Sequence, residues 1–296
     1  MTREAASNPT HYGDWSALLG FLPERDALEF IHRAVPSPLT TDDEWLARIR
    51  TARDAASGVP SRAGTRPATD EIPSRLAGRL ATLEGEPTFQ ELLPGTRSHR
   101  FAMVELSKLR CYQVNLDLEY LASLARSVPA AADEEGTMRF CLPLREERKV
   151  SEVLLSSNPE ANSVSLISED LGLRLMGTVS GEYPASDRKF TGFVYGFGTP
   201  LFSVTEYRGA FTIKNGYHRA LALLRKGHVM APALVMATEN PSLVTPARAG
   251  YFPIETITSE RPPLLSDFDS PAAVTIPRRR SRVVITMHAE AQVTPV

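Results

Sequence analysis

The chain has 296 residues, of which 42% are apolar and 23% are charged, and its formal net charge is −2. These values are typical of a globular protein with a sizeable core. A nearly neutral charge excludes a general attraction to nucleic acid or to anionic membranes, so any basic site has to be local.

Targeting and redox features are also informative. No apolar run approaches the ~18–20 residues of a membrane helix, and the charged N-terminus is unlike a signal peptide. Cys111 and Cys141 match neither a zinc spacing nor a C-x-x-C pair. We therefore expect reduced thiols in a cytoplasmic protein with no membrane partner.

Residues 1–56 predict a helical N-terminal region. Residues 26–34 have apolar side chains at helical spacing, and Thr41 or Asp42 is a suitable N-cap for a helix whose apolar face includes Trp45 and Ile49. Residues 57–73 are rich in Gly, Pro, Ser, Thr, Ala and Arg, which indicates a linker or mobile loop. Residues 74–100 predict a helical connection.

The next region, residues 101–240, predicts a domain with both strands and helices. A strand over 101–106 precedes an extended connection, and a leucine-rich helix follows over 118–128. Within the less regular part, about 130–200, we expect a strand over 138–144. Alternating residues at 162–167 and 172–179 predict one hairpin. Residues 201–207 and 210–213 predict another, with Arg208 and Gly209 as its turn.

The second strand of that last hairpin leads into Asn215, Gly216, Tyr217, His218 and Arg219. Gly216 permits a sharp turn from strand to helix. The helix that follows favours an anion at its N-terminus, and His218 and Arg219 add further donors there. This segment predicts phosphate binding more clearly than any particular reaction.

Residues 241–296 form a Pro-rich C-terminal extension with a final predicted strand at 282–293. One dense basic run precedes that strand, and two interpretations of it remain open: contact with DNA phosphates, or a solvated segment that guards the apolar strand. Its cations are Arg278, Arg279, Arg280 and Arg282.

Two motifs in this order resemble the ParB/sulfiredoxin-like superfamily. The first motif is Leu-Ser-Lys-Leu-Arg (106–110) with the polar turn that follows it. The second is Lys-Asn-Gly-Tyr-His-Arg (214–219), followed by a short helix, Gly227 and an apolar strand. The resemblance covers roughly residues 101–240 and implies an α+β fold with a mixed sheet and an insertion at about 130–200.

The resemblance also implies which residues would hold a nucleotide such as CTP, ATP or ADP, with Mg²⁺ as a possible companion. Gly216, Tyr217, His218 and Arg219 would line its phosphate site, beside Asn215. Three residues of the first motif would face the same pocket: Lys108, Arg110 and Gln113.

The chain departs from this family at several points. Tyr217 stands where sulfiredoxin needs a cysteine, which argues against thiol chemistry. Asn215 replaces an acidic residue of many members and removes a metal or base role there; no protein metal ligand is predicted. No helix-turn-helix region follows residue 240, which argues against a chromosome-segregation role.

The leading hypothesis is a nucleotide- or phosphate-binding protein, with phosphotransfer or nucleotide hydrolysis as its chemistry if it is an enzyme. Candidate catalytic groups are His218, as a base, and the carboxylates of Glu105 and Glu206 near strand ends. The alternative is a non-catalytic DNA-associated accessory or regulatory protein, and a nuclease is the weaker one. A homodimer is compatible with each.

Overall fold

The computed structural model has an α+β fold and consists of two compact units. Unit 1 comprises Met1–Arg148 and Pro200–Arg279, and unit 2 comprises Lys149–Thr199 and Arg280–Val296. The structure describes residues 12–35, 40–90, 92–93, 96, 98–148, 151–170, 172–182, 189–198, 200–246, 250–279, 282–288 and 290.

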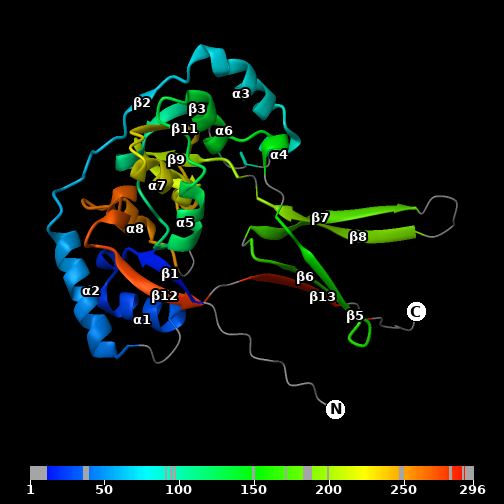
Figure 1. Ribbon diagram of the computed structural model, residues 1–296, viewed down its shortest axis with the longest axis horizontal. Coiled ribbons are helices and arrows are strands. Elements are labelled where there is room, and N and C mark those ends of the chain that lie inside the picture. Colours follow the sequence, from blue (N-terminus) through cyan, green and yellow to red (C-terminus); the bar gives the residue numbers. More distant parts are fainter. Residues whose placement is uncertain are drawn as a thin grey trace. The chain divides into compact units, whose positions relative to one another are not determined.

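A five-stranded mixed sheet forms the centre of unit 1 (Figure 1). Its order is β10 (Ala210–Asn215), β9 (Ser203–Tyr207), β11 (Met230–Ala237), β3 (Ser98–Glu105) and β2 (Thr69–Asp70). The strands β9 and β11 are parallel, and the other neighbours are antiparallel. Residues 231–236 are all buried, so β11 lies in the core.

The predicted hairpin at Arg208 and Gly209 is confirmed, because β9 and β10 pair on either side of it. Both turn residues have left-handed backbone angles, with φ of 51° and 75°. Such a two-residue turn matches the twist of the strands that it joins. The outer edge of β10 pairs with Arg110, whose N–H and carbonyl groups bond to Phe211 and Ile213 at 2.9 Å each.

A second, three-stranded sheet contains the first described strand, β1 (Tyr12–Ala17), between β12 (Val274–Arg279) and β4 (Asn115–Asp117). The sequence predicted a helical region over residues 1–56 with no strand in it, so β1 corrects this part of the prediction. A short apolar run has no decisive period of its own. Its strand character comes from β12 and β4, which lie far away in the sequence (Figure 1).

The two predicted N-terminal helices are confirmed as α1 (Glu24–Ala34) and α2 (Asp42–Ser57). Thr41 caps α2 in a reciprocal arrangement with Glu44. The Thr41 hydroxyl accepts from the Glu44 N–H at 3.4 Å, and the Glu44 carboxylate accepts from the Thr41 N–H at 3.0 Å. A capping box of this kind satisfies N–H groups that the helix itself leaves without partners.

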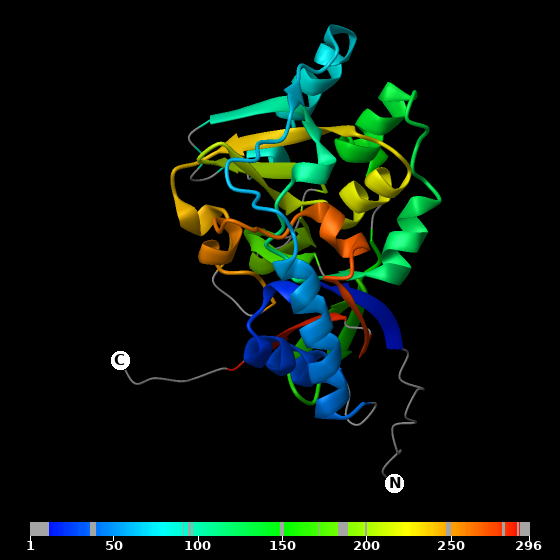
Figure 2. The same ribbon diagram turned by 90° about the vertical axis from the view of Figure 1, so that its left-hand side faces the viewer.

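Residues 58–73, which we call the strap, are anchored along their length. The Arg62 N–H donates to the Glu260 carbonyl at 2.6 Å, and its guanidinium pairs with Asp267. Further along, Ala68 and Glu105 exchange hydrogen bonds at 3.0 Å. Figure 2 shows the strap in light blue, running from the end of α2 past the orange part of the chain. The segment predicted to be a linker or mobile loop is thus hydrogen-bonded to other parts of unit 1.

The remaining helices of unit 1 are short, and one of them contradicts the sequence prediction. Residues 138–144 were expected to form a strand, but the chain is helical up to Cys141 because Asp133 caps a helix there, accepting from the Gly136 N–H at 2.8 Å. The buried residues Met138, Cys141 and Leu142 have helical spacing. These helices are α3 (Ala77–Glu84), α4 (Pro87–Gln90), α5 (Leu118–Ala125), α6 (Glu134–Cys141), α7 (Tyr217–Arg225) and α8 (Ile254–Ile257).

Unit 2 consists of two small sheets. One has the order β13 (Val283–His288), β6 (Ser163–Ser168) and β5 (Leu154–Asn158), and the other pairs β7 (Leu173–Glu182) with β8 (Lys189–Phe197). The predicted final strand is therefore confirmed as β13. The predicted hairpin between 162–167 and 172–179 is wrong, because alternation identifies a strand but not its partner.

No helix in the described part of the chain combines the length and apolar character needed to cross a bilayer.

Candidate functional site

The predicted turn between strand and helix joins β10 to α7. Gly216 has φ of 92°, and a Cβ atom there would lie 3.0 Å from a ring carbon of Phe202 and 3.3 Å from its Cα. Only glycine accepts this backbone angle and this close approach without strain. The main-chain N–H groups of the first turn of α7 follow immediately, at the end of the helix that favours an anion.

Tyr217 is buried and ties the two motifs together. Its hydroxyl accepts from the N–H groups of Tyr112 and Gln113, at 2.9 and 3.4 Å, and donates to the Ile213 carbonyl at 2.8 Å. Burial raises the pKa of this phenol well above its usual value. The side chain therefore holds the segment after the first motif against the turn.

His218 is an uncharged acceptor at neutral pH. Its Nε2 accepts from the Asp117 N–H at 3.0 Å, so the ring proton is on Nδ1. Burial lowers the pKa of His218 to about 4, with the nearby Asp117 carboxylate acting in the opposite direction. The lone pair that a general base would use is therefore already occupied.

His218 makes stability depend on pH. In the unfolded state His218 becomes protonated below about pH 6.5, whereas in the folded state it becomes protonated only near pH 4. The free energy of unfolding is therefore expected to fall as the pH drops from 6.5 to 4, by at most about 3 kcal/mol. Urea denaturation at several pH values measures this slope. His218→Gln keeps an acceptor for Asp117 without titrating, so its slope should be smaller, and an unchanged slope would contradict the assignment.

The Arg219 side chain is directed to the protein. The Nη1 of Arg219 donates to the carbonyl groups of Pro200 and Cys141, at 2.6 and 3.3 Å. Asn215 ends β10 opposite Ser203. Lys214, which sequence reasoning did not include among the site residues, is half-buried, and burial lowers its pKa. Its place at the start of the second motif was the available signal.

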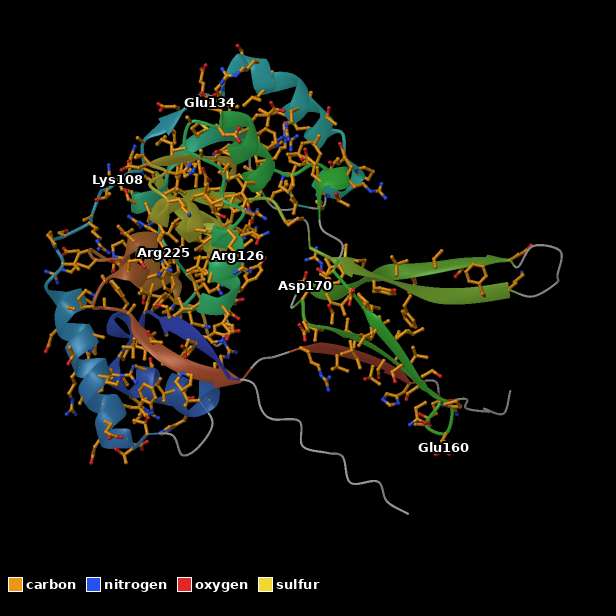
Figure 3. All side chains as sticks on the ribbon, viewed as in Figure 1. Lys108, Arg126, Glu134, Glu160, Asp170 and Arg225 are labelled. Atoms are coloured by element: carbon orange, nitrogen blue, oxygen red, sulfur yellow. The ribbon has the colours of Figure 1, made fainter. Side chains whose placement is uncertain are left out.

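The first motif contributes side chains with different directions. Lys108 pairs with Glu105 at 2.9 Å and is partly exposed (Figure 3). Gln113 donates to the Asn115 carbonyl at 2.9 Å. Arg110 lines a cavity at the far end of β10, away from Gly216.

The two candidate carboxylates are not close to each other. Glu105 lies opposite Met230 and Glu206 opposite Ala237, at the two ends of β11. At a rise of about 3.3 Å per residue they are roughly 20 Å apart along the strand, too far to share one metal ion. Each also has a cationic partner: Lys108 for Glu105 and Arg100 for Glu206.

The basic run is not a uniform surface. Arg278 stacks on the Trp15 ring, with 4.4 Å from its guanidinium carbon to the ring centroid, and burial lowers its pKa. Arg279 ends β12 opposite Tyr12, and Arg282 is exposed just before β13. Arg280 lies outside the described residues.

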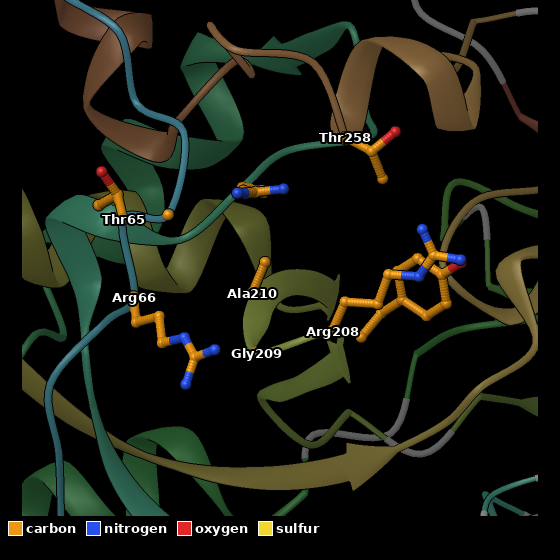
Figure 4. Close-up of a pocket in the computed structure, with 9 residues that line it drawn as sticks. Thr65, Arg66, Arg208, Gly209, Ala210 and Thr258 are labelled. Carbon is orange, nitrogen blue, oxygen red and sulfur yellow. The ribbon is translucent and has the colours of Figure 1, made fainter.

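The cavity that Arg110 lines is formed by the strap and the β9–β10 hairpin (Figure 4). Two further arginines line it, Arg66 and Arg208. Sequence reasoning missed both, because neither belongs to a motif and they are brought together only by the fold.

No protein-family model matches the chain, and comparisons with curated proteins and with solved structures likewise give no match.

Proposed function

We propose that unit 1 binds a nucleotide, such as CTP, ATP or ADP, with its phosphates at the start of α7. The observation that carries this proposal is the junction of the two motifs around Gly216. Tyr217 holds the segment at Tyr112 and Gln113, and His218 holds the one at Asp117. These contacts support a turn that is held in place on both sides, and the main-chain N–H groups of the first turn of α7 are the proposed phosphate donors.

Charge at the turn supports an anionic ligand. Lys214 is half-buried two residues before Gly216, and the helix dipole adds positive potential at the same place. A nearby phosphate would offset the desolvation that lowers the pKa of this amine. Since the His218 side chain is neutral, its role in the proposal is to position the turn and not to carry charge.

If unit 1 is an enzyme, the proposed reaction at the bound nucleotide is phosphotransfer or hydrolysis. Because Glu105 and Glu206 lie at opposite ends of β11, at most one of them can activate an acceptor or help to hold Mg²⁺ at a given nucleotide. The DNA-associated alternative and the nuclease have less support, because Arg278 is committed to Trp15.

Thermal unfolding with each of CTP, ATP, ADP and GTP, with and without Mg²⁺, tests the proposal. A nucleotide present at ~100 times its dissociation constant stabilises the folded state by about 2.7 kcal/mol, which is several degrees in melting temperature. Lys214→Gln should reduce the shift. Lys226→Gln, which removes an exposed amine at the other end of α7, should not. The absence of a shift with all four nucleotides would rule out the proposed function.

A further inference from the structure

The cavity between the strap and the β9–β10 hairpin has a volume of about 220 Å³. It is lined by strap residues 64–66, by residues 207–210 of the hairpin, and by Arg110 and Thr258. Three arginines and two threonines thus line one space. No lining residue is acidic.

The positive charge of this cavity is not balanced by a carboxylate among the described residues. In the part of the chain that the structure describes, Arg66, Arg110 and Arg208 form no ion pair with a carboxylate. Arg110 is only 9% exposed, and its Nη1 donates to the Ile257 carbonyl at 2.7 Å. A buried cation without a counter-ion is costly, and two more cations beside it increase that cost.

Arg208 lies in the turn of the hairpin. Arg208 has φ of 51°, a left-handed angle that costs a residue other than glycine roughly 1 kcal/mol. Its guanidinium lies over the Tyr207 ring, 5.0 Å from the centroid. At Gly209 a Cβ atom would lie 2.7 Å from the guanidinium carbon of Arg66, so the turn leaves room for that side chain.

We propose that this cavity binds a small phosphate or phosphate monoester. Guanidinium groups bind such oxyanions through paired, charge-assisted hydrogen bonds, and the Thr65 hydroxyl can add a neutral donor. The Thr258 hydroxyl already donates to the Ile254 carbonyl at 2.8 Å. The volume lies below the ~300–1,000 Å³ of pockets for larger ligands, so the cavity suits a phosphate group with few additional atoms.

This site is separate from the proposed nucleotide site. Ala210 begins β10 at the cavity, whereas Asn215 ends β10 beside Gly216. At about 3.3 Å per residue the two ends of the strand are roughly 17 Å apart. A phosphate bound by the three arginines therefore does not occupy the turn at the start of α7.

Calorimetric titration of the full chain with inorganic phosphate tests the inference. We expect saturable binding that is at least about tenfold weaker in the double variant Arg66→Gln and Arg208→Gln. Both side chains are exposed at the cavity mouth, so the variant is expected to fold. Arg126→Gln, which removes an exposed guanidinium elsewhere in unit 1 (Figure 3), should bind as tightly as the wild type.

Two results would overturn the inference: no saturable binding of phosphate by the wild type, or equal affinity in the wild type and the double variant. Lys214→Gln separates this site from the nucleotide site, because it should retain phosphate binding while reducing the nucleotide-induced shift. If the nucleotide proposal fails, the phosphate titration still decides this one.

Discussion

Replacing Arg62 with alanine is expected to lower the free energy of unfolding by about 3–5 kcal/mol. The Asp267 side chain is 4% exposed and accepts from both terminal nitrogens of Arg62, at 2.5 and 2.7 Å, and from the Leu264 N–H at 2.7 Å. Without Arg62, a buried carboxylate loses its only guanidinium partner among the described residues and the strap loses an anchor. Urea denaturation measures the change.

Arg75 provides the matched control. It also pairs with a carboxylate, that of Glu134, but the two side chains are 65% and 50% exposed. Arg75→Ala should therefore cost no more than about 1 kcal/mol. The double variant Arg62→Ala and Asp267→Leu should recover part of the loss, because it leaves no buried charge unpaired. Equal losses in Arg62→Ala and Arg75→Ala would show that the strap is not anchored in this way.

Gly216→Ala is expected to cost about 2–4 kcal/mol, the second large effect. The new methyl group would clash with both the ring and the backbone of Phe202. A backbone φ of 92° is also unfavourable for alanine. Since the turn would have to shift, nucleotide binding should be lost as well. Chemical denaturation and the nucleotide-induced thermal shift report these two effects separately.

Gly227 provides a control that separates the effect of backbone strain from the effect of contact with a neighbouring side chain. It has a similar φ of 86°, but nothing lies within 4 Å of a Cβ atom built there. Gly227→Ala should therefore cost only about 1 kcal/mol. If Gly216→Ala and Gly227→Ala lowered the free energy of unfolding equally, the close approach of Phe202 would not explain why residue 216 has to be glycine.

Local features of the sequence predicted the fold best where neighbouring residues determine the structure. Thr41 was one of two expected N-caps and does cap α2, and Arg208 with Gly209 forms the expected turn. Predictions failed where distant partners decide. The strand β1 depends on β12 and β4, and the partners of β6 are β5 and β13 instead of the neighbouring β7.

The same distinction applies to the candidate sites. The conformation of Gly216 follows from its local pattern, whereas the direction of the Tyr217, His218 and Arg219 side chains depends on the segments packed around α7. These segments turn all three toward internal hydrogen bonds. The arginine cavity had no sequence signal, because its cations come from three separate parts of the chain.

The pairing of β1 with β12 has a consequence for synthesis of the protein. Residues 12–17 leave the ribosome long before residues 274–279, yet the two strands pair along their full length. Until then β1 has at most β4 beside it and one exposed edge, the kind of surface that promotes aggregation of nascent chains. Unit 1 therefore cannot be completed before residues 274–279 have been synthesised.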